Sequence, residues 1–183
     1  MSKKKNILVG VTGGIAAYKS CELVRLLVKG DYNVKVVMTQ AAAEFVTPLT
    51  FQTLSRNPVY LKMFDLVQDE NIRHISLADW ADIAVVAPAS ANTLSKIVRG
   101  ICDNLLTSVI CALPQKTKVI FAPAMNENMW NNPLIQENIK ALKQIKNYKL
   151  LNVGAGELAC GITGCGRMIE PKDIFDTIKK LSV

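Results

Sequence analysis

The segment that decides the fold is Asn6 to Met38, NILVGVTGGIAAYKSCELVRLLVKGDYNVKVVM. It begins with a short aliphatic run, Ile7 to Val11, and passes through Thr12-Gly-Gly14 into a stretch with apolar residues at helical spacing. Gly30 lies where that helical pattern stops, and a second β-branched run, Val34 to Met38, follows it. A strand, a helix and a second strand in this order predict a βαβ unit.

Three more short runs repeat the strand pattern further along the chain. Each is aliphatic at almost every position, which indicates strands buried on both faces of a parallel sheet. Thr47-Pro48 and Pro171 predict helix starts, because proline at the first helical position favours them. The sequence therefore predicts a single-domain, doubly wound α/β fold of the Rossmann or flavodoxin-like type over residues 1–183, with helices on both faces of the sheet. The three runs are Ile83–Ala87, Lys118–Ala122 and Leu150–Val153.

Length and composition exclude several classes of protein. At about 150 residues per domain, a chain of 183 residues has room for one domain. With 50% hydrophobic and 20% charged residues, the composition is far from that of disordered proteins. The longest stretches without Asp, Glu, Lys or Arg are 13 residues, at 6–18 and 83–95, and a bilayer span needs roughly 20. Because the basic start, Lys3 to Lys5, runs into the first strand without a cleavage signal, we expect a cytoplasmic protein and no membrane partner.

The ionisable residues argue against nucleic acid and metal ions as ligands. The formal net charge is +7, but five of the positive charges lie near the ends, at Lys3 to Lys5 and Lys179-Lys180, and there is no basic helix. The five cysteines include no C-x-x-C pair, and His74 is the single histidine. We therefore expect no metal and no nucleic acid, and assign the charge to solubility and anionic small molecules.

In a doubly wound sheet, ligands bind beyond the carboxyl ends of the strands. Small, hydroxyl and amide side chains prevail in four of the five segments at these positions, and they suit a phosphate and a polar heterocycle. The five segments are 12–15, 39–42, 88–93, 123–130 and 154–168.

Two of these segments are candidates for phosphate contact. Gly13-Gly14 lacks the G-x-G-x-x-G spacing and the P-loop lysine, so the turn alone is one explanation of the two glycines. The other explanation is that they let backbone N–H groups approach an anion. Ser90, Asn92 and Thr93 are typical helix caps, and capping is compatible with phosphate binding. Because no acidic residue is placed for a ribose hydroxyl, a mononucleotide such as FMN is favoured over NAD.

The segment 123–130, PAMNENMW, is the most informative one. Asn126 follows a rigid proline and precedes Met129 and Trp130, so its NH2 group is predicted to bind a carboxylate beside an apolar wall. A proline-asparagine turn with a buried aromatic anchor explains the same pattern about equally well.

His74 and Cys160 are the candidates for proton transfer. His74 is the only base of near-neutral pKa in the sequence, in a predicted helix that packs Ile75 and Leu77 or Ala78, but a lone histidine is more often a surface or core residue. Cys160 lies in the glycine-rich segment 154–168, which indicates a flexible surface loop or flap that could deliver a thiol to a site.

Five motifs follow one another along the chain: 13–19 GGIAAYK, 74–77 HISL with 80–82 WAD, 88–93 PASANT, 123–130 PAMNENMW, and 159–161 ACG with 164–168 GCGRM. In this order, over nearly the whole length, they resemble the flavin-containing cysteine decarboxylases, and most closely the phosphopantothenoylcysteine decarboxylases among them. The ACG motif distinguishes this branch from the relatives that act on peptidyl cysteine.

The resemblance implies FMN as the cofactor, His74 as the catalytic base, Asn126 as the ligand of the substrate carboxylate and Cys160 as the proton donor of the last step. Asn126, Met129 and Ala159 are the expected substrate-binding residues. The expected cofactor-binding residues are Gly13, Gly14, Ile15, Thr39, Ser90, Asn92, Thr93 and Ala124.

The implied reaction is the decarboxylation of 4′-phosphopantothenoylcysteine to 4′-phosphopantetheine in coenzyme A biosynthesis. It proceeds by transient oxidation at the thiol, loss of CO2 and re-reduction of the enethiol. The resemblance also implies a homo-oligomer, a trimer or dodecamer, with active sites between subunits. We expect one decarboxylase domain over 1–183, without a fused synthetase domain.

Two other functions stay open at this point. A flavodoxin-like electron-transfer protein would use the same loops without acting on a cysteine substrate. A flavin prenyltransferase would share the architecture, but Gly13-Gly-Ile15 in place of a Gly-x-Ser-Gly turn argues against it.

Overall fold

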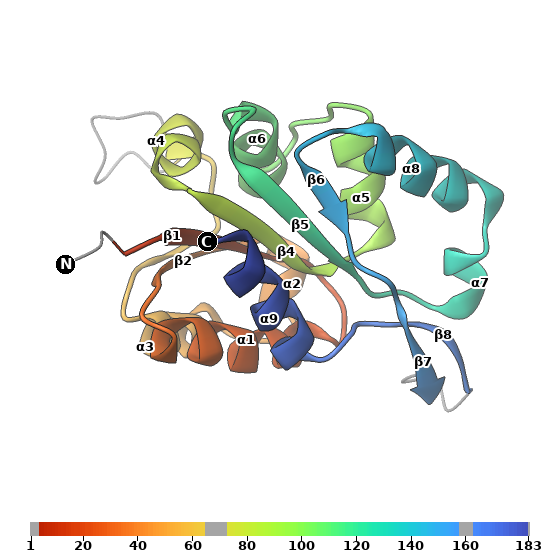
Figure 1. Cartoon of the computed structure of the whole chain (residues 1–183), viewed down its shortest axis with the longest axis horizontal. Helices are drawn as coiled ribbons and strands as arrows, with labels where there is room; N and C mark the ends of the chain where they lie inside the picture. Colours follow the sequence, from red (N-terminus) through yellow and green to blue (C-terminus); the bar gives the residue numbers. More distant parts are fainter. Residues whose placement is uncertain (1–3, 65–72, 158–162, 183) are drawn as a thin grey trace.

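The computed structural model describes residues 4–64, 73–157 and 163–182, and a parallel sheet between two helical layers is its main feature (Figure 1). The strands of this sheet are β1 (Asn6–Val11), β2 (Asn33–Met38), β3 (Val59–Tyr60), β4 (Ile83–Ala89), β5 (Lys118–Pro123) and β6 (Tyr148–Leu150). They lie in the order β3-β2-β1-β4-β5-β6, and every neighbouring pair is parallel.

This strand order confirms the predicted doubly wound α/β fold. The chain extends the sheet in one direction from β1 to β3 and in the other from β4 to β6, so β1 and β4 lie side by side at the centre. The connections that leave these two strands diverge, which opens a crevice at their carboxyl ends. Within the described ranges, no helix has the length and apolar character needed to cross a membrane.

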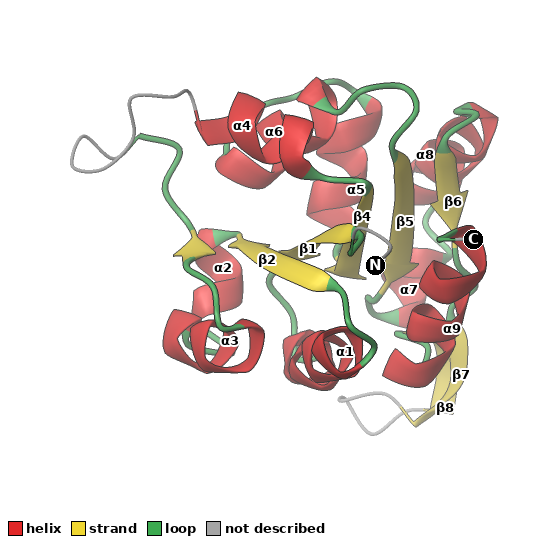
Figure 2. Cartoon of the chain, turned by 60° about the vertical axis from the view of Figure 1, so that its left-hand side comes forward, coloured by secondary structure: helices red, strands yellow, loops and turns green. Residues whose placement is uncertain are grey.

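Alternate residues of the strands supply two separate cores. Ile7, Val9 and Val11 of β1 are buried against one helical layer, and Leu8 is buried against the other. Because successive strand side chains point to opposite faces, the nearly continuous apolar runs serve both layers. One layer holds α1 (Ala17–Lys29), α3 (Pro48–Ser55) and α9 (Pro171–Leu181), and the other holds α4 (Arg73–Trp80), α5 (Ala91–Val98), α6 (Leu105–Ala112) and α8 (Pro133–Gln144) (Figure 2).

The predicted helix ends agree with the structure. The N–H of Gly30 donates to the Leu26 carbonyl over 2.9 Å and ends α1. A Cβ added at Gly30 would lie 2.8 Å from the ring of Phe175, so this glycine also lets α9 pack closely against α1. Pro48 and Pro171 stand in the first turns of α3 and α9.

The fifth predicted strand is wrong in its bounds. We expected Leu150–Val153, but β6 pairs with β5 over Tyr148–Leu150. Leu151 is nevertheless 8% exposed and belongs to the core. The apolar character of Leu151 therefore reflects burial in the core beyond the end of β6 and not pairing with another strand.

The glycine-rich segment, predicted as a surface loop, forms an antiparallel hairpin over its described parts. Its strands are β7 (Gly154–Glu157) and β8 (Thr163–Arg167). The Met125 N–H donates to the Gly166 carbonyl over 2.9 Å, so β8 is also held by the loop that follows β5. The antiparallel pairing of β7 with β8, which glycine content alone does not report, makes this segment extended.

Candidate functional site

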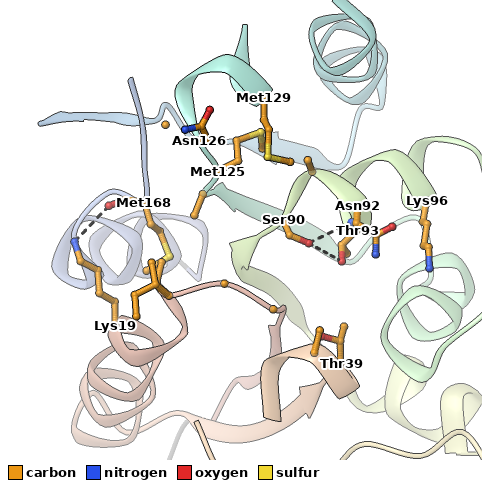
Figure 3. A pocket seen from close by; sticks show the side chains of 18 of the residues that line it. Lys19, Thr39, Ser90, Asn92, Thr93, Lys96, Met125, Asn126, Met129 and Met168 are labelled. Atoms are coloured by element: carbon orange, nitrogen blue, oxygen red, sulfur yellow. Dashed lines mark hydrogen bonds between the residues drawn. The ribbon is translucent and has the colours of Figure 1, made fainter. Parts of the chain in front are cut away.

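A pocket of about 1020 Å³ lies at the carboxyl edge of the sheet, in the crevice between the connections of β1 and β4 (Figure 3). This volume is at the upper end of the range of small-molecule sites. Asn126 and Met129 contribute to its wall, as do all the residues that the sequence assigns to the cofactor. The latter are Gly13, Gly14, Ile15, Thr39, Ser90, Asn92, Thr93 and Ala124.

The two glycines after β1 have different reasons to be glycine. A Cβ added at Gly13 would lie 2.5 Å from the Cβ of Ala41 in the short helix α2 (Gln40–Ala43), so close packing requires Gly13. A Cβ added at Gly14 would meet no atom of the described chain within 4 Å, and Gly14 does not adopt a positive φ. Neither packing nor backbone geometry demands Gly14, and its open space belongs to the pocket, which fits a ligand that approaches the backbone there.

Thr12 connects the two central strands beneath the pocket. Its fully buried hydroxyl donates to the Pro88 carbonyl over 2.8 Å and accepts the Ser90 N–H over 2.9 Å. The turn after β1 and the loop after β4 are thereby held in one arrangement. No role was predicted for Thr12 itself, although a hydroxyl directly after a buried strand is a signal for such a bridge.

The loop after β4 presents the polar groups that were predicted for a phosphate. Ser90 is the N-cap of α5: its hydroxyl accepts the Thr93 N–H at 3.4 Å and donates to the Thr93 hydroxyl at 3.2 Å. Asn92 is exposed in the first turn and lines the pocket. The capping interpretation is confirmed for Ser90, and the three side chains also have the polarity that an anion needs at a helix start.

An ion pair forms the adjacent wall. Lys96 Nζ lies 2.5 Å from the carboxylate of Asp103, and both residues line the pocket beside Asn104. The hydrogen bond from Lys96 lowers the pKa of the Asp103 carboxyl, with a further contribution from Asn104. Neither charged residue was among the sequence candidates, because residues 96 and 103 lie outside the segments that directly follow the strands.

Asn126 begins the short helix α7 (Glu127–Trp130), on the side of the pocket formed by Met125 and Met129 (Figure 3). Its Oδ1 accepts the Asn128 N–H over 2.8 Å. This cap fixes the orientation of the amide, whose NH2 group is its donor end. Trp130 packs against the core but is only half-buried, so the aromatic anchor is confirmed and its full burial is not.

A second charged cluster borders the pocket at the end of β8. Buried Lys19 donates to the Glu170 carboxylate over 2.7 Å, and an Arg167 nitrogen lies 3.5 Å from the same oxygen. The hydrogen bond from Lys19 lowers the pKa of Glu170, and the charge of Arg167 adds to this effect. The motifs that end in Lys19 and that contain Arg167 were noticed in the sequence, but these two residues received no role.

The other catalytic candidates are not brought into this pocket by the described part of one chain. His74 lies half-buried in the first turn of α4, and it does not line the pocket. In Figure 1, α4 lies at the end of the sheet away from α5 and α7. The predicted helix is confirmed, with Leu77 and Ala78 buried, but the packing of Ile75 was predicted wrongly, since it is 45% exposed. Ala159 and Cys160 lie outside the described residues.

The fold and the pocket define the class of protein: an α/β protein with a cavity of nucleotide size at the switch point of a doubly wound sheet. Among the described residues, no three His, Cys, Asp or Glu side chains gather where they could hold a metal ion. The chain belongs to the Flavoprotein family, whose model matches residues 1–182.

Known proteins with similar sequences indicate a more specific class. A probable phosphopantothenoylcysteine decarboxylase of Streptococcus mutans is 45% identical over 176 residues, which cover 96% of this chain and 98% of that protein. The coenzyme A biosynthesis bifunctional protein CoaBC of Bacillus subtilis is 44% identical over 180 residues. This chain covers 44% of the CoaBC protein, so it spans less than half the length of that relative.

Solved structures show the same fold over the whole length. A PPC decarboxylase variant in complex with pantothenoylaminoethenethiol superimposes with a TM-score of 0.87 at 33% identity and covers 98% of this chain and 99% of its own. The FMN binding protein AtHal3 superimposes with a TM-score of 0.83 at 34% identity and covers 98% of this chain and 97% of its own.

Proposed function

We propose that this protein binds FMN and decarboxylates 4′-phosphopantothenoylcysteine to 4′-phosphopantetheine, a step of coenzyme A biosynthesis. The observation that carries the proposal is that one pocket combines polar groups suited to a phosphate, at Ser90 and Thr93, with the oriented amide of Asn126. The full-length similarity to a probable phosphopantothenoylcysteine decarboxylase supports the substrate. The similarity to a decarboxylase bound to an enethiol compound supports the reaction.

The residues of the pocket fit FMN. Ser90, Asn92 and Thr93 would hold its phosphate with the backbone at Gly13 and Gly14, while Ile15, Thr39 and Ala124 would complete the cofactor wall. The open space at Gly14 supports this placement, because no atom of the described chain lies close enough to explain why the residue is a glycine. The chemistry that FMN supplies when bound is a reversible two-electron exchange with the thiol-bearing carbon of the substrate, which creates the electron sink that CO2 loss requires.

Asn126 would bind the substrate carboxylate through its NH2 group. The cap to Asn128 holds the amide in one orientation, so the carboxylate would be bound in a defined direction next to Met129. An apolar wall beside a departing carboxylate favours its conversion to neutral CO2, because the charged form loses solvation there. Asn126 thus orients the group that leaves, and it need not exchange a proton.

His74 and Cys160 would move the protons. His74 would accept the proton released when the thiol-bearing carbon is oxidised, and Cys160 would supply one when the enethiol is reduced. Because the two electrons removed in the oxidation are returned in the reduction, the overall reaction has no net redox change. Because His74 does not line the pocket of its own chain, we infer that it acts in the site of another copy. The protein would therefore work as a homo-oligomer, a trimer or dodecamer, with sites between subunits.

Exposed apolar residues at the pocket rim support this arrangement. Ile15 and Tyr18 are each 58% exposed and Met129 is 48% exposed, and all three line the pocket. Apolar side chains gathered at a cavity mouth are typical of an interaction surface. A second copy would cover them.

One decarboxylase domain and a cytoplasmic location stay predictions that accompany this function.

The function is tested with the purified protein. We expect a yellow protein with a flavin spectrum that releases CO2 from 4′-phosphopantothenoylcysteine, forms 4′-phosphopantetheine in equal amount and consumes no external reductant. The analogue with serine in place of cysteine should release none, because it has no thiol to oxidise. Colourless protein after incubation with FMN would contradict the cofactor. A flavin that cycles with an external reductant but yields no CO2 would identify an electron-transfer protein instead.

Subunit mixing tests whether the site is shared. We expect His74→Asn and Asn126→Asp to be inactive alone, and an equal mixture, dissociated and reassembled, to regain about a quarter of native activity. The reason is that one site in four then combines an intact His74 with an intact Asn126 from its neighbour. A mixture that stays inactive after proven exchange of subunits would place both residues in one chain's site.

A further inference from the structure

Strand β8 is attached to the loop that carries Asn126 by hydrogen bonds on both sides of that residue. The Met125 N–H donates to the Gly166 carbonyl over 2.9 Å. The Glu127 carboxylate accepts the Cys165 N–H over 3.1 Å. The hairpin strand β8 and the loop that carries Asn126 therefore form one connected unit.

The contact leaves little freedom at Gly166. This residue has a φ of +133°, and an added Cβ would lie 2.3 Å from the Met125 carbonyl oxygen. The residues that follow, Arg167 and Met168, line the pocket together with Gly166. Any shift of β8 relative to the Asn126 loop would thus move a wall of the pocket.

We propose that Glu127 is a positioning residue that holds β8 at the correct distance from Asn126. It supplies the one side-chain acceptor in this contact among the described residues, and its partner is a backbone N–H immediately before Gly166. This inference rests on the proposed function, since it assigns to Glu127 the placement of the pocket wall against the bound substrate. Glu127 also lies in the first turn of α7, where the helix dipole favours a negative charge. The effect of its charge must therefore be distinguished from the effect of its acceptor oxygen.

Three variants separate these roles. Glu127→Ala removes the acceptor and the charge, Glu127→Gln keeps an acceptor oxygen without the charge, and Glu137→Ala removes an exposed glutamate of α8 as a matched control. We expect the Cys165 amide to exchange its hydrogen roughly ten-fold faster in Glu127→Ala, and close to the native rate in Glu127→Gln and the control. This exchange is measured on the FMN-loaded protein and does not depend on turnover.

Steady-state kinetics supply the second readout. In Glu127→Ala, kcat should fall by about three- to ten-fold while KM changes little, because Asn126 still binds the carboxylate but the wall is less often in the productive geometry. Glu127→Gln should restore kcat. Unchanged exchange at Cys165, a native kcat in Glu127→Ala, or a Glu127→Gln variant as impaired as Glu127→Ala would each overturn the proposal. A native protein without decarboxylase activity would instead refute the proposed function.

Discussion

Replacing Gly14 with alanine should weaken the binding of FMN strongly without destabilising the fold. The added methyl meets no atom of the described chain within 4 Å, and the backbone there is not left-handed, so folding has no reason to oppose it. A cofactor lying against this backbone would be displaced by the methyl group. We expect FMN to bind about ten- to hundred-fold more weakly, the cost of overpacking one methyl. Fluorescence titration of the apoprotein and thermal unfolding without FMN measure the two quantities.

Gly13→Ala is the matched comparison, because here the methyl would strike the protein itself. Its Cβ would lie 2.5 Å from Cβ and 3.0 Å from the carbonyl carbon of Ala41. This variant should lose about 1–3 kcal/mol of unfolding free energy in the absence of FMN. If Gly14→Ala instead bound FMN with native affinity, the space beside Gly14 would not be the cofactor site, and the placement of the phosphate would be wrong.

The fold could be predicted because strands that are buried on both faces are apolar at almost every position. Ile7 to Val11 and Ile83 to Ala87 have few polar interruptions since alternate residues enter different cores. The end of β6 and the hairpin could not be predicted in the same way. The bounds of β6 depend on its pairing with β5, and the hairpin depends on the register between its own two strands; composition contains no information about either.

The site was partly predictable for a topological reason. Parallel strands end at one edge, so the segments that follow them converge whatever their separation in sequence, and this rule alone brings Thr39, Ser90 and Asn126 to one pocket. The ion pair of Lys19 with Glu170 could not be predicted, because the two residues are 151 apart in sequence and pair only in the folded chain. His74 is a different case: its expected role came from the resemblance, and it does not line the pocket of its own chain, so the topological rule could not have assigned it to the site.

Asn126→Asp should remove almost all turnover while leaving the protein folded and yellow. Aspartate caps a helix as well as asparagine does, so the bond from the Asn128 N–H to the side-chain oxygen is expected to persist. What changes is the other end of the side chain: a donor NH2 becomes a negatively charged oxygen facing the substrate carboxylate. Loss of a hydrogen bond to a charged group, together with like-charge repulsion, should lower kcat/KM by roughly 10²–10³-fold.

Asn132→Asp provides the matched control for this substitution. Asn132 caps α8 in the same manner, with its Oδ1 accepting the Leu134 N–H over 2.9 Å, but it does not line the pocket. Both variants should unfold at nearly the native temperature, and only Asn126→Asp should lose activity. If Asn126→Asp retained native kcat/KM, the carboxylate would be bound elsewhere, because a negative charge at its ligand would repel it. If both variants lost activity equally, a general effect of the added charge, and not the contact at Asn126, would explain the loss.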